Sequence, residues 1–392
     1  MNGSTQPVDS VLTKLNAINA DDFHTDGDRS KALLAAYALV SRLETPWETV
    51  ARLCMNQPAL GASLKVAKDL FLFEKWHERG DSAEDTKGLA EMVNCDPVLL
   101  GRFLRHLAVN HMLQEVSGGK FKPTDFTLSL LKPEFGEWIT YLYDSSIPCF
   151  YKTPEYLQKT GYKNPIDPED GIFQYTKGYK GGLFEYYTAN PREGDSFNHV
   201  MGGVMAQQAS WLDIIPAESF LNGADASLPL VVDVGGNIGH DVEKFRRVYP
   251  DRAAQLYLQD RAAVIKLSKC PDPVNKMTHD FFEPQPIKGS RVYYMHGIIH
   301  DWSDEPARKI LQMLRDALKP GYSKLLIHDH VVPDTSTHPH ATSYDLTMMA
   351  VVAGQERTET EWHALLQSAG YKITQIWRSP LAAQAIIEAD LA

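Results

Sequence analysis

The chain has 392 residues, of which 43% are hydrophobic, and a formal net charge of −11. This length is enough for a sizeable core and indicates two domains, or one large domain with an appendage. An acidic chain repels phosphate backbones and anionic lipids, which argues against nucleic acid and membrane surfaces as partners. No apolar run approaches the length of a bilayer span, and residues 1–10 lack the basic and apolar regions of a secretion signal, so we expect a soluble, cytoplasmic protein.

The first third of the chain is predicted to be mainly helical. Residues 28–44 and 64–76 carry apolar positions at helical spacing. Residues 85–113 have the pattern of two short helices joined near Asp96, and the segment after them predicts a hairpin around Gly118. Two helices followed by a hairpin outline a winged helix.

A winged helix can bind DNA or serve in packing between domains or subunits. The basic side chains of the second predicted helix are Arg102, Arg105 and His106, which are few for a DNA-binding surface on an acidic chain. Packing or dimerisation is therefore the favoured interpretation. We expect residues 1–125 to form a helical dimerisation domain with a winged-helix-like part.

Residues 126–215 are rich in aromatic residues and proline, and residues 154–179 have an irregular, loop-like pattern. Loops of that length usually have a function. We expect this part to be a helical and loop connector between two domains.

From residue 216 onwards, short apolar runs alternate with helical patterns. This alternation predicts an α/β fold with a parallel sheet covered by helices. One helix is well signalled, because Asp304 and Glu305 suit the positive end of a helix dipole and Pro306 suits the first turn. Residues 371–379 and 383–391 look like two closing strands.

A glycine-rich turn follows the first predicted strand of this part. The sequence LPLVVDVGGNIGHDVEKF places Asp233 at the strand, with Gly235, Gly236 and Gly239 before a helix, so a nucleotide-like ligand can approach the backbone closely. Asp260 ends the next predicted strand, at the distance downstream where an acid commonly holds a ribose hydroxyl. The alternative is a plain tight turn with a solvated surface acid.

Polar residues recur where the predicted strands end. They are Asp233, Asp260, Asp280, His300 and Asp329. Because ligands of doubly wound sheets bind beyond the carboxyl ends of the strands, these side chains are expected to share one rim. His300 follows a run of apolar residues and precedes Asp301, which favours a chemical role over that of a hydrogen-bonded core histidine.

Two further groups of side chains leave alternatives open. His328 and His330, with His338 and His340 beyond them, could be metal ligands, but the spacing is not diagnostic and we expect no metal. The four cysteines lie far apart and form no C-x-x-C pair, so buried or incidental thiols are expected in place of disulfides or a zinc site: Cys54, Cys95, Cys149 and Cys270.

Five segments, taken in order, resemble a known family: residues 183–203, 228–239, 279–284, 298–311 and 353–371. They are similar to the S-adenosylmethionine-dependent O-methyltransferases of the plant caffeate and flavonoid type and their fungal secondary-metabolite relatives. The resemblance runs from about Leu183 to the carboxyl terminus. It implies a Rossmann-like class I methyltransferase domain over residues 216–392, a pocket-lining connector and a homodimer.

The resemblance also implies roles for individual residues. Asp233, Gly235, Gly236 and Gly239 would surround the methionine part of S-adenosylmethionine, Asp260 would hold the ribose, and Asp280 and Phe281 would flank the adenine. His300 would be the general base, oriented by Glu356 and Asp329. Phe197, Asn198 and Met201 would line the cleft for acceptor and cofactor, and S-adenosylhomocysteine would be the product. Asp301 is a further candidate for an acceptor contact. Met348, Met349 and Phe173 could line the same pocket, with packing in the core as the equally open alternative.

This sequence departs from the family pattern in three places. Asn237 stands where relatives commonly have glycine, a change that asparagine tolerates because it adopts left-handed conformations more readily than most residues. His296 occupies the place of a lysine or arginine, so its expected cofactor contact is open. Asp329 is one methylene shorter than the glutamate that relatives often carry.

The leading hypothesis is an O-methyltransferase that acts on a phenolic or enolic hydroxyl of an aromatic or polyketide-type small molecule. The alternative is a cofactor-bound protein of the same fold that promotes pericyclic ring closure or dehydration without methyl transfer. His300 together with Glu356 favours transfer, since an electrostatic catalyst needs no phenol base. A nicotinamide dehydrogenase and a non-catalytic regulator fit the motifs less well.

Overall fold

The computed structural model describes residues 8–207, 210–335, 339–379 and 384–392. The chain divides into two compact units, residues 1–62 and 63–392, and each is described by itself. The predicted boundaries at residues 125 and 215 stay predictions. Among the described residues, no helix has the length and apolarity that a membrane crossing requires.

The first unit is built from helices that bury little of their own surface. They are α1 (Val8–Asn16), a short 3₁₀ turn η1 (Ala20–Asp22), α2 (Asp26–Leu43), α3 (Pro46–Ala51), a π-helical turn η2 (Arg52–Asn56) and the start of α4 (Gln57–Asp69). Thr45 caps α3 in a reciprocal capping box with Glu48, and Pro46 occupies the first turn. The helix predicted over residues 28–44 is confirmed as α2.

The segment for which a winged helix is predicted lies at the start of the second unit. Its elements are α5 (Leu72–Glu78), β1 (Glu84–Asp85), α6 (Thr86–Val93), α7 (Pro97–Val109), β2 (Leu113–Val116), β3 (Lys120–Pro123) and α8 (Asp125–Ser129). Strands β2 and β3 form the predicted antiparallel hairpin, and β1 pairs with β3. The helical pattern predicted over residues 64–76 is confirmed by α4 and α5, which are separated at Phe71 by a left-handed conformation (φ 54°).

Helices dominate the connector. They are α9 (Pro133–Tyr141), a π-helical turn η3 (Leu142–Ser146), α10 (Ile147–Thr160), α11 (Ile172–Lys177), α12 (Leu183–Ala189) and α13 (Pro191–Gln207). The loop-like pattern predicted over residues 154–179 is therefore wrong at both ends, where α10 and α11 form. Only the stretch between these two helices is irregular, and Pro154 is accommodated inside α10.

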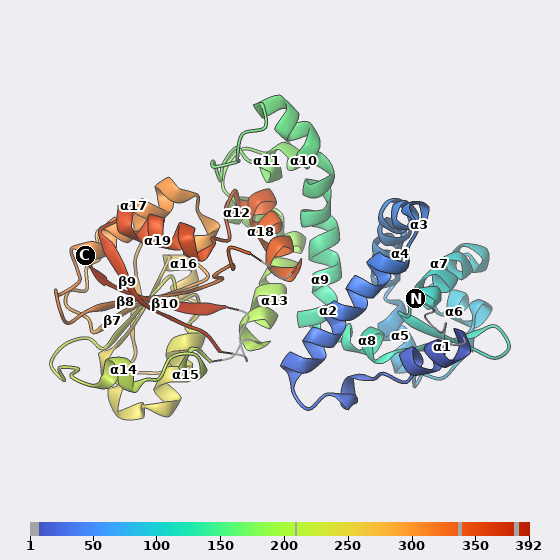
Figure 1. The fold of residues 1–392 in the computed structure, drawn as a ribbon, viewed down its shortest axis with the longest axis horizontal. Helices are drawn as coiled ribbons and strands as arrows, with labels where there is room; N and C mark the ends of the chain where they lie inside the picture. Colours follow the sequence, from blue (N-terminus) through green and yellow to red (C-terminus); the bar gives the residue numbers. More distant parts are fainter. Residues whose placement is uncertain (1–7, 208–209, 336–338, 380–383) are drawn as a thin grey trace, which may run out of the picture. The chain divides into compact units, whose positions relative to one another are not determined.

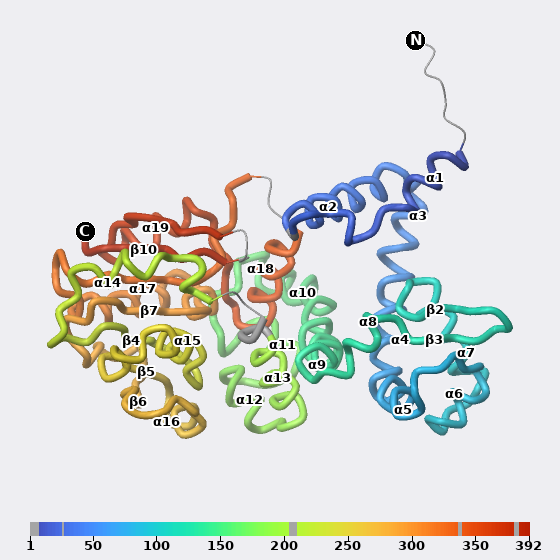
Figure 2. The backbone as a smooth tube through the Cα atoms, turned by 90° about the horizontal axis from the view of Figure 1, so that it is seen from below, coloured from blue at the N-terminus to red at the C-terminus, as the bar shows by residue number. Residues whose placement is uncertain are grey.

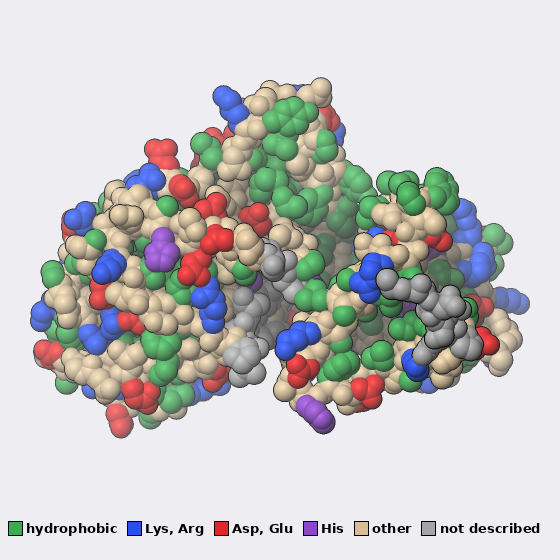
Figure 3. Space-filling view, in the orientation of Figure 1, with side chains coloured by type: hydrophobic (Ala, Val, Ile, Leu, Met, Phe, Trp, Pro, Cys, Tyr) green, Lys and Arg blue, Asp and Glu red, His purple; other side chains and the backbone are tan. Residues whose placement is uncertain are grey.

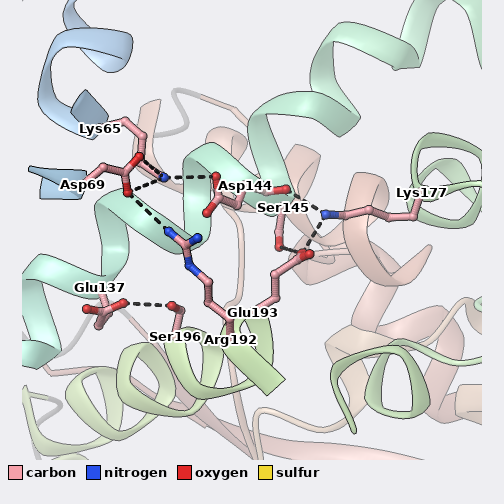
Figure 4. A network of polar contacts seen from close by, with 9 residues as sticks. All are labelled: Lys65, Asp69, Glu137, Asp144, Ser145, Lys177, Arg192, Glu193 and Ser196. Carbon is pink, nitrogen blue, oxygen red and sulfur yellow. Dashed lines mark hydrogen bonds and ion pairs between the residues drawn. The ribbon is translucent and has the colours of Figure 1, made fainter. Parts of the chain in front are cut away.

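A partly buried polar network ties the connector helices together (Figure 4). Lys177 of α11 pairs with Glu193 of α13 at 2.6 Å and donates to the carbonyl of Asp144 at 2.8 Å. Ser145 donates to the same Glu193 carboxylate at 3.1 Å, and Lys65 pairs with Asp144 at 3.4 Å. Because these charges are paired and partly shielded from water, they fix the π-helical turn against α4, α11 and α13.

The remaining chain forms a seven-stranded sheet in the order β6-β5-β4-β7-β8-β10-β9. Figure 2 labels β6, β5, β4, β7 and β10, which follow one another in this order. Its strands are β4 (Val231–Val234), β5 (Leu256–Asp260), β6 (Asn275–Thr278), β7 (Val292–His296), β8 (Lys324–Asp329), β9 (Tyr371–Trp377) and β10 (Ala385–Leu391). The first five are parallel, and β10 runs antiparallel to both β8 and β9. The predicted α/β fold and the two closing strands are confirmed.

Helices cover both faces of this sheet (Figure 1). On one face lie α17 (Asp304–Arg315) and α19 (Glu359–Ser368), which pack on side chains that include Tyr293 and Ile327. On the other face lie α14 (Glu218–Leu221) and α15 (His240–Val248), which pack near Tyr294 and Leu326. Successive residues of β7 and β8 thus enter opposite cores. Two further helices, α16 (Ala262–Ile265) and α18 (Pro339–Val352), follow β5 and β8.

The strand ends differ from the prediction at His300. Strand β7 stops at His296, Gly297 turns the chain with φ 62°, and His300 lies in a short 3₁₀ turn, η6 (Ile299–Asp301). The prediction that His300 ends the strand is therefore wrong, because a glycine in a left-handed conformation ends the extended backbone first. Asp260 and Asp329 are the last residues of their strands, as predicted.

Candidate active site

The glycine-rich turn after β4 leaves no space for side chains. Gly235 and Gly239 have positive φ angles of 74° and 98°. A Cβ atom at Gly236 would lie 2.4 Å from the Asp233 carboxyl group, and one at Gly239 would lie 2.2 Å from Sγ of Cys270. Glycine is therefore required both for the backbone conformation and for close packing.

Asp260 closes this turn from the neighbouring strand. Its carboxylate accepts hydrogen bonds from the backbone N–H of Asn237 at 2.8 Å and of Arg261 at 2.7 Å. Burial raises the pKa of Asp260, although these two N–H donors act in the opposite direction. Asn237 adopts the expected left-handed conformation (φ 53°), which presents its N–H to Asp260.

Asp233 is buried beside the turn. It is 1% exposed, and neither carboxylate oxygen has a hydrogen-bond partner among the described residues. Burial and the nearby charges of Asp241 and Asp260 raise its pKa well above the ordinary value of 3.8. A buried acid with both oxygens free to accept suits a ligand that brings a positive charge or hydrogen-bond donors.

Aromatic rings lie at the adjacent strand end. Asp280 accepts a hydrogen bond from the N–H of Phe282 at 2.9 Å, which shapes the turn after β6. Phe281 meets Trp302 edge to face, with ring centroids 6.0 Å apart, and Phe282 meets the same ring at 4.8 Å. These rings form an apolar surface next to the glycine turn, since a Cβ at Gly235 would lie 3.7 Å from the ring of Phe281.

His300 and Glu356 form a buried pair. Nδ1 of His300 lies 2.6 Å from Oε1 of Glu356, and both residues are less than 9% exposed. The other ring nitrogen, Nε2, lies 3.6 Å from the Asp301 carboxylate. A carboxylate held at Nδ1 fixes the ring orientation and leaves Nε2 as the atom that can exchange a proton with a ligand.

The charges around His300 decide its protonation. Burial by itself lowers the pKa of His300, but the charges of Glu356, Asp329 and Asp301 and the hydrogen bond to Glu356 outweigh it, so the pKa lies well above the ordinary 6.5. Burial raises the pKa of Asp329 to about 7, with His300 opposing the rise and Glu356 adding to it. The structure thus groups one histidine with the three acids that the sequence placed nearby.

His296 is held by protein partners at both ring nitrogens. Its Nδ1 lies 2.6 Å from Oδ2 of Asp241, and its Nε2 lies 3.0 Å from Oε1 of Gln384. The ring stacks on His328 at a centroid distance of 3.9 Å, and His328 in turn contacts the hydroxyl of Tyr294 at 2.7 Å. The cofactor contact expected of His296 stays a prediction.

His328, His330 and His340, which the sequence offers as possible metal ligands, belong to the part of the chain that the structure describes. No group of three His, Cys, Asp or Glu side chains among the described residues is arranged to hold a metal ion. The carbonyl of His330 accepts a hydrogen bond from the Trp362 indole at 2.9 Å, and the ring of His330 lies against Tyr344. His338 lies outside the described residues.

Several predicted acceptor contacts gather in one apolar cluster. Phe173 is fully buried there, with Phe197, Met201 and Met349 packed against the same core. Tyr187 stacks on Phe197 with ring centroids 5.0 Å apart. Two other predicted residues lie outside this cluster: Asn198 is exposed on α13, and Met348 is half-buried on α18.

Tyr344 was missed by the reasoning from sequence. Its ring lies nearly parallel to that of His300, with an interplanar angle of 14° and centroids 6.3 Å apart. Burial raises the pKa of Tyr344, and the charges of Glu356 and Asp301 raise it further. Tyr344 and Met349 both lie on α18, so this helix connects the base to the apolar cluster. The sequence offers one signal for Tyr344: it lies four residues before Met348, so the two side chains share one face of a helix.

Comparison with known proteins fits this geometry. The family model described as "O-methyltransferase domain" matches residues 162–372. The O-methyltransferase mfmE of Annulohypoxylon moriforme is 62% identical over 388 residues, which cover 99% of this chain and 96% of that protein. The O-methyltransferase asqD of Emericella nidulans is 37% identical, with 83% and 84% of the two chains covered.

Solved structures share the fold over nearly the whole chain. One described as "A Pericyclic Reaction enzyme" has a TM-score of 0.87 and 25% identity, with 98% of this chain and 99% of that chain covered. OxaC in complex with sinefungin and meleagrin has a TM-score of 0.83 and 25% identity, with 98% of each chain covered. The family model and the full-length relatives decide the classification: this chain belongs to the S-adenosylmethionine-dependent O-methyltransferase family and is an enzyme of that family.

Proposed function

We propose that this protein transfers the methyl group of S-adenosylmethionine to a phenolic or enolic hydroxyl of a small aromatic or polyketide-type molecule, with His300 as the general base. The observation that carries the proposal is the buried His300–Glu356 pair, 2.6 Å apart, placed beyond the strand ends beside the glycine turn. The relatives mfmE and asqD, both named O-methyltransferases, support the reaction class.

The residues at the strand ends fit S-adenosylmethionine. Asp233, with two free acceptor oxygens, suits the positively charged methionine end, and Asp260 is placed to accept from ribose hydroxyls while it holds the turn. Phe281 offers an apolar ring for the adenine. When bound, the cofactor supplies a methyl group that is already activated by its sulfonium, so the protein needs mainly to align the acceptor and remove a proton.

Removal of that proton is the task assigned to His300. A phenol ionises near pH 10 in water, so transfer at neutral pH benefits from a base at the acceptor oxygen. The proton moves from the acceptor hydroxyl to Nε2, and Glu356 at Nδ1 stabilises the imidazolium that forms. The same carboxylates that raise the pKa of His300 therefore favour the protonated product of this step.

The acceptor is proposed to be neutral. The charges that act most strongly on His300 are the three carboxylates of Glu356, Asp329 and Asp301. An acceptor that brought its own carboxylate close to the base would meet like charges in a buried site, which is costly. The cluster reached through α18 is aromatic and aliphatic, with Phe197 and Met349 at its edge. These surroundings support an uncharged, largely apolar acceptor.

A second candidate function is ring closure or dehydration with the cofactor bound but unchanged. It is favoured by the likeness to the structure described as "A Pericyclic Reaction enzyme", which covers 98% of this chain. Methyl transfer is supported more strongly, because an electrostatic role for the cofactor does not require the His300–Glu356 pair. Fold likeness by itself does not choose between the two reactions.

We also propose a homodimer, formed through the first unit. Large apolar side chains of residues 8–55 are exposed, including Trp47 at 70% and Leu53 at 51%. Figure 3 shows hydrophobic side chains at the surface over α3. Apolar exposure on this scale is typical of a surface that another chain covers.

The first test measures transfer. Purified protein with methyl-labelled S-adenosylmethionine and a panel of phenolic and polyketide-type acceptors should give labelled product and S-adenosylhomocysteine by mass spectrometry. His300→Gln should slow transfer by at least about 100-fold, since it removes the base, and should leave cofactor affinity nearly unchanged. His363→Gln, an exposed histidine on α19, is the control. Full activity in His300→Gln would remove the assignment, and an acceptor altered without gaining a methyl group would establish the second candidate.

The second test uses pH. Only neutral His300 can accept a proton, so kcat/KM for the cofactor should rise as pH passes upward through the pKa of His300, which lies above 6.5. Glu356→Gln removes the anion that stabilises the imidazolium, so it should lower this pKa, move the rise to lower pH and reduce the maximum rate. Glu356→Asp keeps the charge and should keep the rise near its original pH. If kcat/KM of Glu356→Gln rises at the same pH as that of the wild type, the proposed pairing of Glu356 with His300 is contradicted.

The third test compares matched acceptors, a phenol that carries a carboxylate and the methyl ester of the same molecule. The ester should have the higher kcat/KM, by at least about tenfold, which corresponds to roughly 1.4 kcal/mol. The neutral primary amide serves as the control for size and should behave like the ester. Equal or better use of the carboxylate would show that the acids do not select the acceptor.

The fourth test measures mass in solution. Light scattering should give twice the chain mass of 44.0 kDa. Trp47→Asp and Leu53→Asp should shift the protein toward monomer, because a charge would be buried in the interface. Val248→Asp, at an exposed position of α15, is the control and should leave the mass unchanged. A monomeric wild type would exclude the proposed dimer.

A further inference from the structure

Arg357 is an always-charged side chain with no solvent exposure. Its guanidinium donates to two backbone carbonyls, from Nη1 to Ile299 at 3.2 Å and from Nη2 to Trp302 at 2.8 Å. Nε and Nη2 both donate to Oδ1 of Asp304, at 3.0 and 2.8 Å. One side chain therefore holds the turn that carries His300 at both of its ends.

That turn is weakly held by its own backbone. Its two internal hydrogen bonds run from Asp301 N to Ile298 O at 3.3 Å and from Trp302 N to Ile299 O at 3.2 Å, which is the long end of the normal range. A 3₁₀ turn of three residues has little stability of its own. The position of the His300 ring therefore depends on contacts from outside the turn.

Those contacts come from consecutive residues of one segment. A Cβ at Gly354 would lie 2.3 Å from the carbonyl oxygen of His300, which shows how closely the segment approaches the turn. The N–H of Gln355 donates to that same carbonyl at 2.8 Å. Glu356 then holds the imidazole, and Arg357 holds the carbonyls on either side.

Arg357 also connects the segment that carries Asp329. Its backbone carbonyl accepts from the N–H of Val332 at 3.0 Å, just beyond the end of β8. Its guanidinium lies 5.5 Å from the ring centroid of Trp362, whose indole donates to the carbonyl of His330. The three segments that supply His300, Glu356 and Asp329 therefore all meet at one residue.

We propose that Arg357 is a positioning residue for methyl transfer, which aligns the turn bearing His300 with the carboxylate of Glu356. This inference rests on the proposed role of His300 as the base. Arginine suits the task because its planar fork reaches two carbonyls and a carboxylate at once, whereas a lysine ammonium on a flexible stem cannot hold the same three acceptors in plane. Asp304, which is 60% exposed at its side chain, neutralises the guanidinium.

The test compares Arg357→Lys with Arg378→Lys in the full-length protein. Arg378 pairs on the surface with Glu359, the first residue of α19, which begins two residues after Arg357. Arg378→Lys should therefore behave like wild type. Arg357→Lys should reduce kcat at least about tenfold and change the cofactor dissociation constant less than about threefold, because none of the four guanidinium hydrogen bonds reaches the glycine turn. It should also move the rise of kcat/KM to lower pH, since a looser turn weakens the hold of Glu356 on the imidazolium.

The pKa of His300, followed by NMR titration of the imidazole, gives a readout that needs no transfer. It should fall in Arg357→Lys and stay constant in Arg378→Lys. If Arg357→Lys fails to fold, Asp304→Ala removes the acceptor of two of the four hydrogen bonds at a partly exposed site and should shift kcat and the pKa of His300 in the same direction. Wild-type kcat and an unchanged pKa in the folded variants would overturn the proposal, as would equal losses of kcat and cofactor affinity. Failure of the proposed function would differ, because the wild type itself would then transfer no methyl group.

Discussion

An imidazolium inside a protein needs anions close to it, and the surroundings of His300 supply them. Burial opposes the imidazolium of His300, while Glu356, Asp329 and Asp301 favour it by a larger amount. The acids also repel each other, and burial raises the pKa of Asp329 to about 7. A change at any one of these side chains therefore alters the pKa of the others.

The fold brings these side chains together through backbone features that have little chemistry of their own. Gly297 ends β7 early and lets the chain turn, so His300 leaves the plane of the sheet. Gly354 lets the segment of Glu356 approach the carbonyl of His300. The glycine turn after β4 similarly removes side chains from the place where a ligand can approach Asp233. Close backbone contact, which only glycine permits, thus creates both halves of the site.

Methyl transfer and cofactor-assisted ring closure can share this architecture, because the proposed cofactor site at the glycine turn would serve either reaction. Beside the base, α18 carries Tyr344, whose ring lies against that of His300, and part of the aromatic and aliphatic cluster that it shares with α11 and α13. The polar network of Lys177 and Glu193 fixes two of these helices.

The sequence by itself determined the features that depend on near neighbours in the chain. The alternation of strands and helices, the hairpin at Gly118, the glycine turn and the acids at the ends of β5 and β8 follow from local periodicity and backbone conformation. Only the tertiary structure decided which side chains pair: Glu356 with His300 across 56 residues, Asp241 with His296 across 55, and Arg357 with three separate segments. The family resemblance named Glu356 and His296, yet neither it nor local spacing predicted the pairing of His296 with Asp241 or the contacts of Arg357. The physical reason is that local conformation is set by adjacent residues, whereas pairing between distant side chains is set by how the layers pack.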